Sequence, residues 1–130
     1  MTTELFYLAL TAALTTLLWI PYIVGRVKSA GPMKAEDYKS PRNPEMPAGV
    51  IRANRVHLNA LEVLPSFTAL VLVAHLGMQN NWITALACTV FFWSRIAYTI
   101  VYWLGTPFIR TPVFAIGVIS QLVIFSQIIL

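Results

Sequence analysis

The chain has 130 residues, which is enough for one domain. Hydrophobic residues make up 58% of it and charged residues only 11%, whereas a soluble domain carries about 25% charge. This composition excludes a water-soluble domain and predicts an integral membrane protein in contact with the lipid bilayer. The net charge of +4 comes from cations beside the apolar segments, where they act as topology signals and not as a nucleic-acid-binding surface.

The chain contains apolar runs long enough to cross a bilayer, which needs about 20 helical residues. The apolar part of the second helix, residues 63–76, is short for a span, so its polar first turns must sink partway into the bilayer or its interface. We expect helices at about 4–25, 52–77, 81–104 and 112–130. The expected fold is therefore all-α, a single-domain membrane bundle of four helices that run up, down, up and down. The single cysteine, Cys88, excludes a disulfide scaffold and a cysteine-based metal site, and we predict no metal.

The first segment is interpreted as a retained span and not as a signal peptide, because it lacks a basic start and its apolar run is too long. Pro21 near its end is expected to kink the helix or loosen its last turn. The segment 26–51 that follows is polar, basic and rich in proline, so we expect a loop on the membrane surface. Its lysines and arginines place this loop in the cytoplasm by the positive-inside rule.

The second helix carries the densest group of polar residues. Four of them follow at i, i+3, i+7 and i+10 and share one helix face: Arg52, Arg55, Asn59 and Glu62. Lipid cannot be the partner of this face, because an unpaired charge in hydrocarbon costs several kcal/mol. One interpretation is a helix end whose arginines reach the membrane surface while Glu62 pairs with one of them. The alignment of Asn59 with Glu62 favours a binding site.

The third helix carries the deepest charge, Arg95, which shares a face with Tyr98 and Tyr102 at i, i+3 and i+7. Arg95 needs a partner, and Glu62 is the only carboxylate that we expect within the membrane. An Arg95–Glu62 bridge that only locks two helices together is therefore the structural alternative to a binding site.

The last loop, residues 105–112, carries Arg110 and returns to the side of the long loop, so both termini lie across the membrane. One carboxylate, Glu62, cannot pair with all the arginines on this side, which leaves a demand for anionic partners. A small, multiply anionic ligand with an amine for Glu62 would fit. Glutathione, with two carboxylates, one ammonium group and a thiol, matches, although a nucleotide or a lipid headgroup would also satisfy arginines.

The order Arg55, Asn59, Glu62 and Pro65, preceded by Arg52, resembles the second helix of the MAPEG family, the membrane-associated proteins in eicosanoid and glutathione metabolism. The likeness covers nearly the whole chain, and the short loops are similar to those of bacterial members. It implies a homotrimer in the bacterial inner membrane, with the long loop cytoplasmic. It also implies that glutathione, as cosubstrate, is held between subunits near the cytosolic face.

The resemblance further assigns roles to individual residues. Arg110 would be catalytic and face the sulfur, because a thiol with a pKa of about 8.5 is mostly protonated at neutral pH and an adjacent guanidinium favours the thiolate. Asn59 and Glu62 would bind the backbone and the amine of glutathione. The residues implied in glutathione binding are Arg26, Arg52, Arg55, Asn59, Glu62, Arg95, Tyr98 and Tyr102.

The implied activity is a glutathione-dependent transferase or peroxidase acting on a lipophilic electrophile that enters from the bilayer. Val63 and Tyr98 stand where the leukotriene- and prostaglandin-forming branches have other residues, so their activities are not expected here. Two other classes stay open. A non-catalytic lipid- or glutathione-binding scaffold would need no cation at the thiol, and a small multidrug antiporter would need a free carboxylate, whereas arginines surround Glu62 in the sequence.

Overall fold

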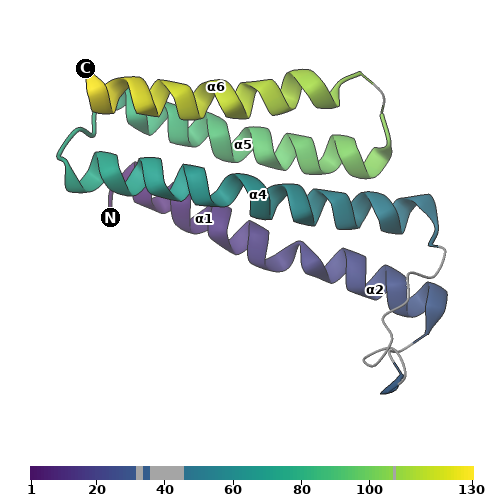
Figure 1. Cartoon of the computed structure of the whole chain (residues 1–130). Coiled ribbons are helices and arrows are strands. Elements are labelled where there is room, and N and C mark those ends of the chain that lie inside the picture. The colour runs from purple at the N-terminus through teal and green to yellow at the C-terminus, as the bar shows by residue number, and fades with distance from the viewer. Residues whose placement is uncertain (32–33, 36–45, 107) are drawn as a thin grey trace.

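The computed structural model describes residues 1–31, 34–35, 46–106 and 108–130. This described part is helical and contains no strand. The helices are α1 (Thr3–Leu17), α2 (Trp19–Ala30), α4 (Ala48–Leu76), α5 (Trp82–Leu104) and α6 (Arg110–Ile129). Because α1 and α2 follow each other as one span, the expected all-α bundle of four membrane-crossing helices is confirmed (Figure 1).

The lengths of the spans fit a bilayer. Each of the four is long and apolar enough to cross a membrane, so the protein is an integral, multi-pass membrane protein. The 20 residues of α6 extend over about 30 Å, close to the thickness of the hydrocarbon core. The 29 residues of α4 extend over about 43 Å, so its first turns can project beyond the hydrocarbon. Both termini lie at the end opposite the last turn of α2 and the first turn of α4, which the long loop connects in the sequence (Figure 1).

The first span is broken at Leu18. Its N–H approaches the carbonyls of both Leu14 and Thr15, at 3.1 and 3.4 Å, and a new helix then begins. Pro21 lacks the N–H that would bond the carbonyl of Leu17. The expected interruption of the helix therefore lies on the N-terminal side of the proline.

The helices on either side of the long loop extend farther than the sequence suggested. Helix α2 continues to Ala30, past the expected end at residue 25, and α4 begins at Ala48 and not at residue 52. Residues 32–33 and 36–45, which form most of the expected surface loop, lie outside the described residues.

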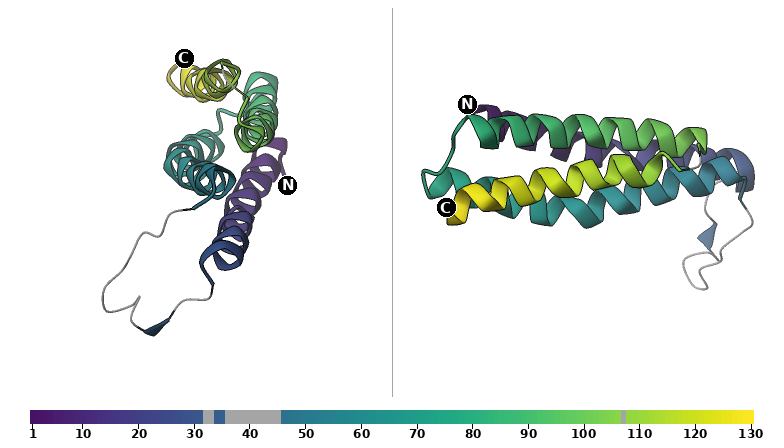
Figure 2. Two further views of the ribbon diagram at one scale, coloured as in Figure 1. Left: turned by 90° about the vertical axis from the view of Figure 1, so that its right-hand side faces the viewer. Right: turned by 90° about the horizontal axis from the view of Figure 1, so that it is seen from above.

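The four spans form a square when viewed along the bundle (Figure 2). Helix α6 has its largest interface with α5 and also contacts α4, while α1 contacts both α4 and α5. Among the described residues, α6 makes no contact with α1 or α2. Helix α6 is therefore diagonally opposite the span that carries Arg26, while α4 lies beside that span.

Two hydrophobic clusters hold the bundle together. In the half nearer the termini, the rings of Phe67 and Phe91 stack with centroids 3.9 Å apart. In the half nearer the long loop, Val56 of α4 packs against Tyr98 and Tyr102 of α5. These buried tyrosines fix the position of the α5 face that looks toward α4 and α6.

The end of the bundle that holds the termini is closed by hydrogen bonds. Glu4 of α1 is buried, and its Oε1 accepts a hydrogen bond from Oγ1 of Thr84 at 2.8 Å. Nδ2 of Asn81 donates to Oε1 of Gln127 at 2.9 Å, which joins the start of α5 to the end of α6. Oδ1 of Asn80, in the turn before α5, is buried at this end without a hydrogen-bond partner among the described residues. The arginines of α4 and α6 lie toward the other end.

Candidate functional site

A cavity of about 330 Å³ lies between α4 and α6 in the half of the bundle near the long loop. Its walls come from α4 and α6, and two tyrosines of α5 form its floor. It is lined by Asn59, Tyr98, Tyr102, Arg110, Thr111 and Phe114. Four of these six were singled out in the sequence. Thr111 and Phe114 were missed, although their spacing from Arg110 places them on neighbouring parts of the same helix turn.

Arg95 supports the floor of this cavity. It is buried, with 4% of its surface exposed, and its Nη2 donates a hydrogen bond to Oδ1 of Asn59 at 2.7 Å. Its guanidinium carbon also lies 4.5 Å from the centre of the Tyr98 ring. The helix-locking bridge from Arg95 to Glu62 is therefore not the contact that forms. Asn59 instead presents its amide NH2, which has no partner among the described residues, at the cavity wall.

Arg110 opens α6, where the sequence suggested a loop. Its guanidinium carbon lies 4.5 Å from the centre of the Tyr102 ring, and Tyr102 in turn packs against Tyr98 with ring centroids 5.5 Å apart. The N-terminus of a helix carries a partial positive charge, so the helix does not neutralise this cation. Guanidinium and helix end together favour an anion in the cavity.

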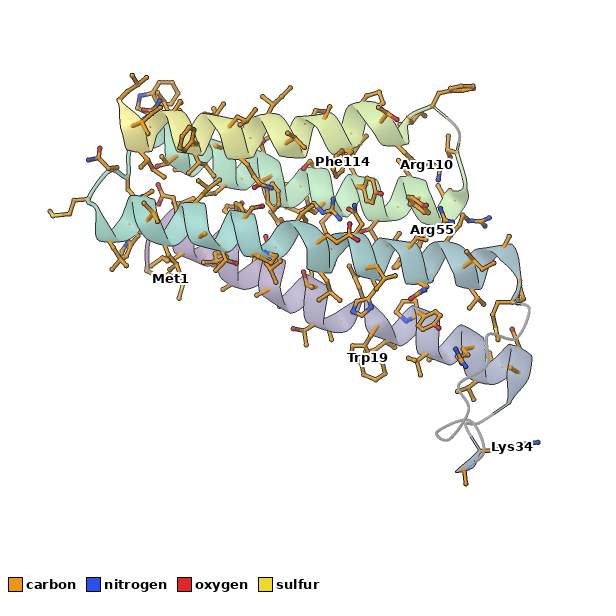
Figure 3. All side chains as sticks on the ribbon, in the orientation of Figure 1. Met1, Trp19, Lys34, Arg55, Arg110 and Phe114 are labelled. Atoms are coloured by element: carbon orange, nitrogen blue, oxygen red, sulfur yellow. The ribbon has the colours of Figure 1, made fainter. Side chains whose placement is uncertain are left out.

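Two further charges lie on the α4 face that carries Asn59. Arg55 and Glu62 are exposed and form no hydrogen bond or ion pair with any residue in the described ranges. Figure 3 shows Arg55 and Arg110 in the half of the bundle nearer Lys34, away from Met1. Because unpaired charges are costly in lipid, both side chains have capacity for a partner beyond the described residues.

Arg26 and Arg52 do not join the cavity within one chain. Arg26 belongs to α2, which does not contact α6 in the described structure, and its Nη1 donates to the hydroxyl of Tyr22 at 3.2 Å. Nε of Arg52 donates to the carbonyl of Trp103 at 3.2 Å. A cation is favourable at this C-terminal end of α5, so Arg52 acts as a cap.

Gly105 makes room for that cap. It has a φ of 70°, and a Cβ atom there would lie 3.3 Å from Cζ of Arg52. Both the left-handed backbone and the close guanidinium favour glycine at this position.

The fold and the cavity define a class, a multi-pass helical membrane protein with a cationic site near one membrane surface. Within that class, the chain belongs to the MAPEG family, whose model matches residues 5–130. No curated protein and no solved structure gives a significant match. Membership confirms the resemblance noted in the sequence and supports a glutathione-related role in a membrane. Membership also separates the chain from multidrug antiporters. The arginines near Glu62 in the sequence do not make this distinction, because Glu62 is unpaired among the described residues.

Proposed function

We propose that this protein is a membrane-bound glutathione transferase or peroxidase that acts on lipophilic electrophiles. The observation that carries the proposal is Arg110, a guanidinium at the wall of the cavity that has an aromatic ring but no anion beside it in the described structure. Asn59, also at the cavity, and Glu62, on the same face of α4, supply the polar groups for a peptide. Membership in the MAPEG family supports glutathione as the cosubstrate.

The charges on α4 match the length of glutathione. Arg55 and Glu62 are seven residues apart, which on a helix is about 10 Å, and a tripeptide in extended form also spans about 10 Å. Glu62 would bind the ammonium group and Arg55 a carboxylate at the other end. The amide NH2 of Asn59, halfway between them, would donate to a peptide carbonyl.

Arg110 would then hold the sulfur as a thiolate, while the thiol proton leaves to water at the cavity mouth. In a transfer, the sulfur electron pair forms a C–S bond as a bond of the electrophile breaks. In a peroxidase reaction, the sulfur attacks one peroxide oxygen, the O–O bond breaks and the second oxygen leaves as the alcohol after protonation. A second glutathione then reduces the sulfenic acid to a disulfide and water.

We further propose that the complete site lies between copies of the chain in a homotrimer. Arg26 lies on α2 and Arg110 on α6, which do not contact each other in the described structure, so a copy could place its Arg26 span against the α4–α6 side of the next copy. A contact between two different faces repeats head to tail, and it closes into a trimeric ring when successive copies are rotated by a third of a turn. The same contact would cover Glu62 and Arg55.

We propose that the basic long loop and the site face the cytoplasm, as the positive-inside rule favours, and that the protein lies in the bacterial inner membrane. The deciding experiment compares glutathione with its analogue that has serine in place of cysteine. Calorimetry of the purified protein in buffers of different ionisation enthalpy should show that glutathione, and not the analogue, releases a proton on binding at pH 7. Equal binding of both without proton release would instead support a non-catalytic glutathione- or lipid-binding scaffold.

A further inference from the structure

One hydrogen bond joins α4 to α6 near the middle of the bundle. Ser66 Oγ donates to Gln121 Oε1 at 2.7 Å, which is shorter than its 3.1 Å distance to the carbonyl of Val63 on its own helix. Ser66 follows Asn59 by seven residues, and Gln121 follows Phe114 by seven, so both lie on the helix faces that line the cavity. Two helical turns place the pair about 10 Å deeper in the membrane than these cavity residues.

The amide of Gln121 is only half satisfied. Its Oε1 accepts from Ser66, while its NH2 group makes no hydrogen bond with any described residue. Gln121 is the twelfth of the 20 residues of α6, so it lies near the centre of the span, about 15 Å from either surface of the hydrocarbon. Lipid headgroups and bulk water do not reach this depth, and unpaired N–H donors are unfavourable there.

A second glutamine on the same helix, Gln127, shows that an unsatisfied amide NH2 group is not a general property of glutamines on α6. Gln127 accepts a hydrogen bond from Asn81, and its Nε2 approaches Oγ of Ser126 at 3.3 Å. Both ends of the Gln127 amide thus have partners within the chain. Gln121 differs by having donors left for a molecule outside it.

We propose that Ser66 and Gln121 form a recognition site for a hydrogen-bond acceptor on the chain of a lipophilic ligand whose polar head lies in the cavity beside Arg110. The identification of this ligand as the second substrate rests on the proposed function. The acceptor is a neutral oxygen, such as a hydroxyl or keto group. A bridge that only locked α4 to α6 would leave the NH2 of Gln121 in hydrocarbon, whereas an oxygen-bearing chain satisfies it.

Helix geometry gives the position of that oxygen. Gln121 follows Arg110 by eleven residues, which corresponds to about 16 Å along α6. An extended chain advances about 1.2 Å per bond, because three backbone bonds span about 3.5 Å. An oxygen near the twelfth carbon of a long-chain acid would therefore reach Gln121 when its carboxylate lies by Arg110.

The test uses detergent-solubilised full-length protein and native mass spectrometry, without glutathione. Equal amounts of stearate and 12-hydroxystearate compete for the protein, and a second sample receives stearate and 2-hydroxystearate. We expect the parent protein to retain the 12-hydroxy acid over stearate by about five- to tenfold, the contribution of one hydrogen bond. The 2-hydroxy acid, whose oxygen stays near the head, should show no such preference.

Three variants locate the effect. Gln121→Leu should abolish the preference for the 12-hydroxy acid and Ser66→Ala should reduce it. Gln127→Leu, the same change on the same helix at a satisfied amide, should leave it intact. Comparing ratios between variants removes the differences in solubility among the acids.

The proposal is overturned if the parent retains both hydroxy acids alike, or if Gln121→Leu keeps the preference. It is also overturned if Gln121→Leu dissociates an oligomer without changing the ratio, because the pair would then be a subunit contact. Should Gln121→Leu fail to fold, the positional comparison in the parent still decides. If the parent prefers the 12-hydroxy acid but glutathione binding releases no thiol proton, the recognition site at Ser66 and Gln121 is supported and the proposed enzymatic function is contradicted.

Discussion

At the scale of single residues, the partner of each guanidinium separates framework from ligand-binding roles. Arg52 caps the end of α5 and Arg95 holds Asn59, so both are engaged by the fold itself. Arg110 has only an aromatic ring beside it, and Arg55 has no partner in the described part of the chain. The latter two are therefore the arginines with capacity left for an anion.

Replacing Arg110 by alanine should separate chemistry from binding. Without the guanidinium the bound thiol returns toward its ordinary pKa, and each unit of that change lowers the thiolate fraction about tenfold. We expect turnover and ultraviolet thiolate absorbance at pH 7 to fall together by at least about tenfold, while calorimetry still detects glutathione. Lys28→Ala removes an exposed charge from α2 and should change neither. Normal thiolate formation in Arg110→Ala would assign the role to another cation.

Replacing Glu62 by glutamine should weaken the binding of glutathione without changing thiolate formation. The ammonium group of glutathione would lose a charged partner worth about 2 kcal/mol, which corresponds to tens-fold weaker binding. Calorimetry measures the affinity, and the thiolate fraction of the bound molecules should stay the same. An unchanged affinity would show that Glu62 serves another purpose, such as a contact between copies.

The sequence predicted the kind of chemistry in the cavity better than it predicted which residues line the cavity. Asn59, Tyr98, Tyr102 and Arg110 were found because regular spacing places polar residues on one helix face. The cap that Arg52 forms was not foreseen, because its acceptor lies 51 residues away and is a backbone carbonyl that any residue could provide. Contacts of this kind follow from how helices pack and leave no pattern in the sequence.

At the scale of helices, the length of the apolar segments was enough to identify the four spans. The predicted end of the last loop, in contrast, relied on the position of a proline. The loop at 105–112 was predicted too long, because Pro112 was taken as its boundary although proline is tolerated in the first turn of a helix. Helix α6 in fact begins at Arg110. This difference of two residues moves Arg110 from a loop to a helix end, where its position is better fixed.

The interface of α5 with α6 depends on a glycine. A Cβ atom at Gly117 would lie 3.2 Å from Oγ of Ser94 and 3.8 Å from the ring of Phe91. Gly117→Leu should force the helices apart and lower stability by about 1–3 kcal/mol, measured as a lower melting temperature in detergent. Val118→Leu enlarges a partly exposed neighbour on the lipid-facing side and should be close to neutral. Equal melting temperatures for both variants would show that the helices do not approach so closely in solution.

At the scale of the whole molecule, two of the arginines implied in glutathione binding and catalysis, Arg26 and Arg110, lie on helices that do not contact each other in the described structure. Arg26 lies on α2, which packs against α4, and Arg110 lies on α6, which α2 does not contact among the described residues. The sequence placed all of these residues near one membrane surface but could not show which side of the bundle each would occupy. The diagonal arrangement of the spans (Figure 2) is the structural reason to expect a site shared by two copies.

Mixing two inactive variants tests this sharing directly. Arg26→Ala and Arg110→Ala are each expected to be impaired, and their chains can be coexpressed with different tags so that mixed oligomers are purified. If a site takes Arg110 from one copy and Arg26 from its neighbour, one of the three sites in each purified mixed trimer is intact, and about a third of the parent turnover should return. If each site lies within one chain, no intact site forms and mixing recovers nothing. Chains that stay monomeric by native mass spectrometry would contradict the shared site before any activity is measured.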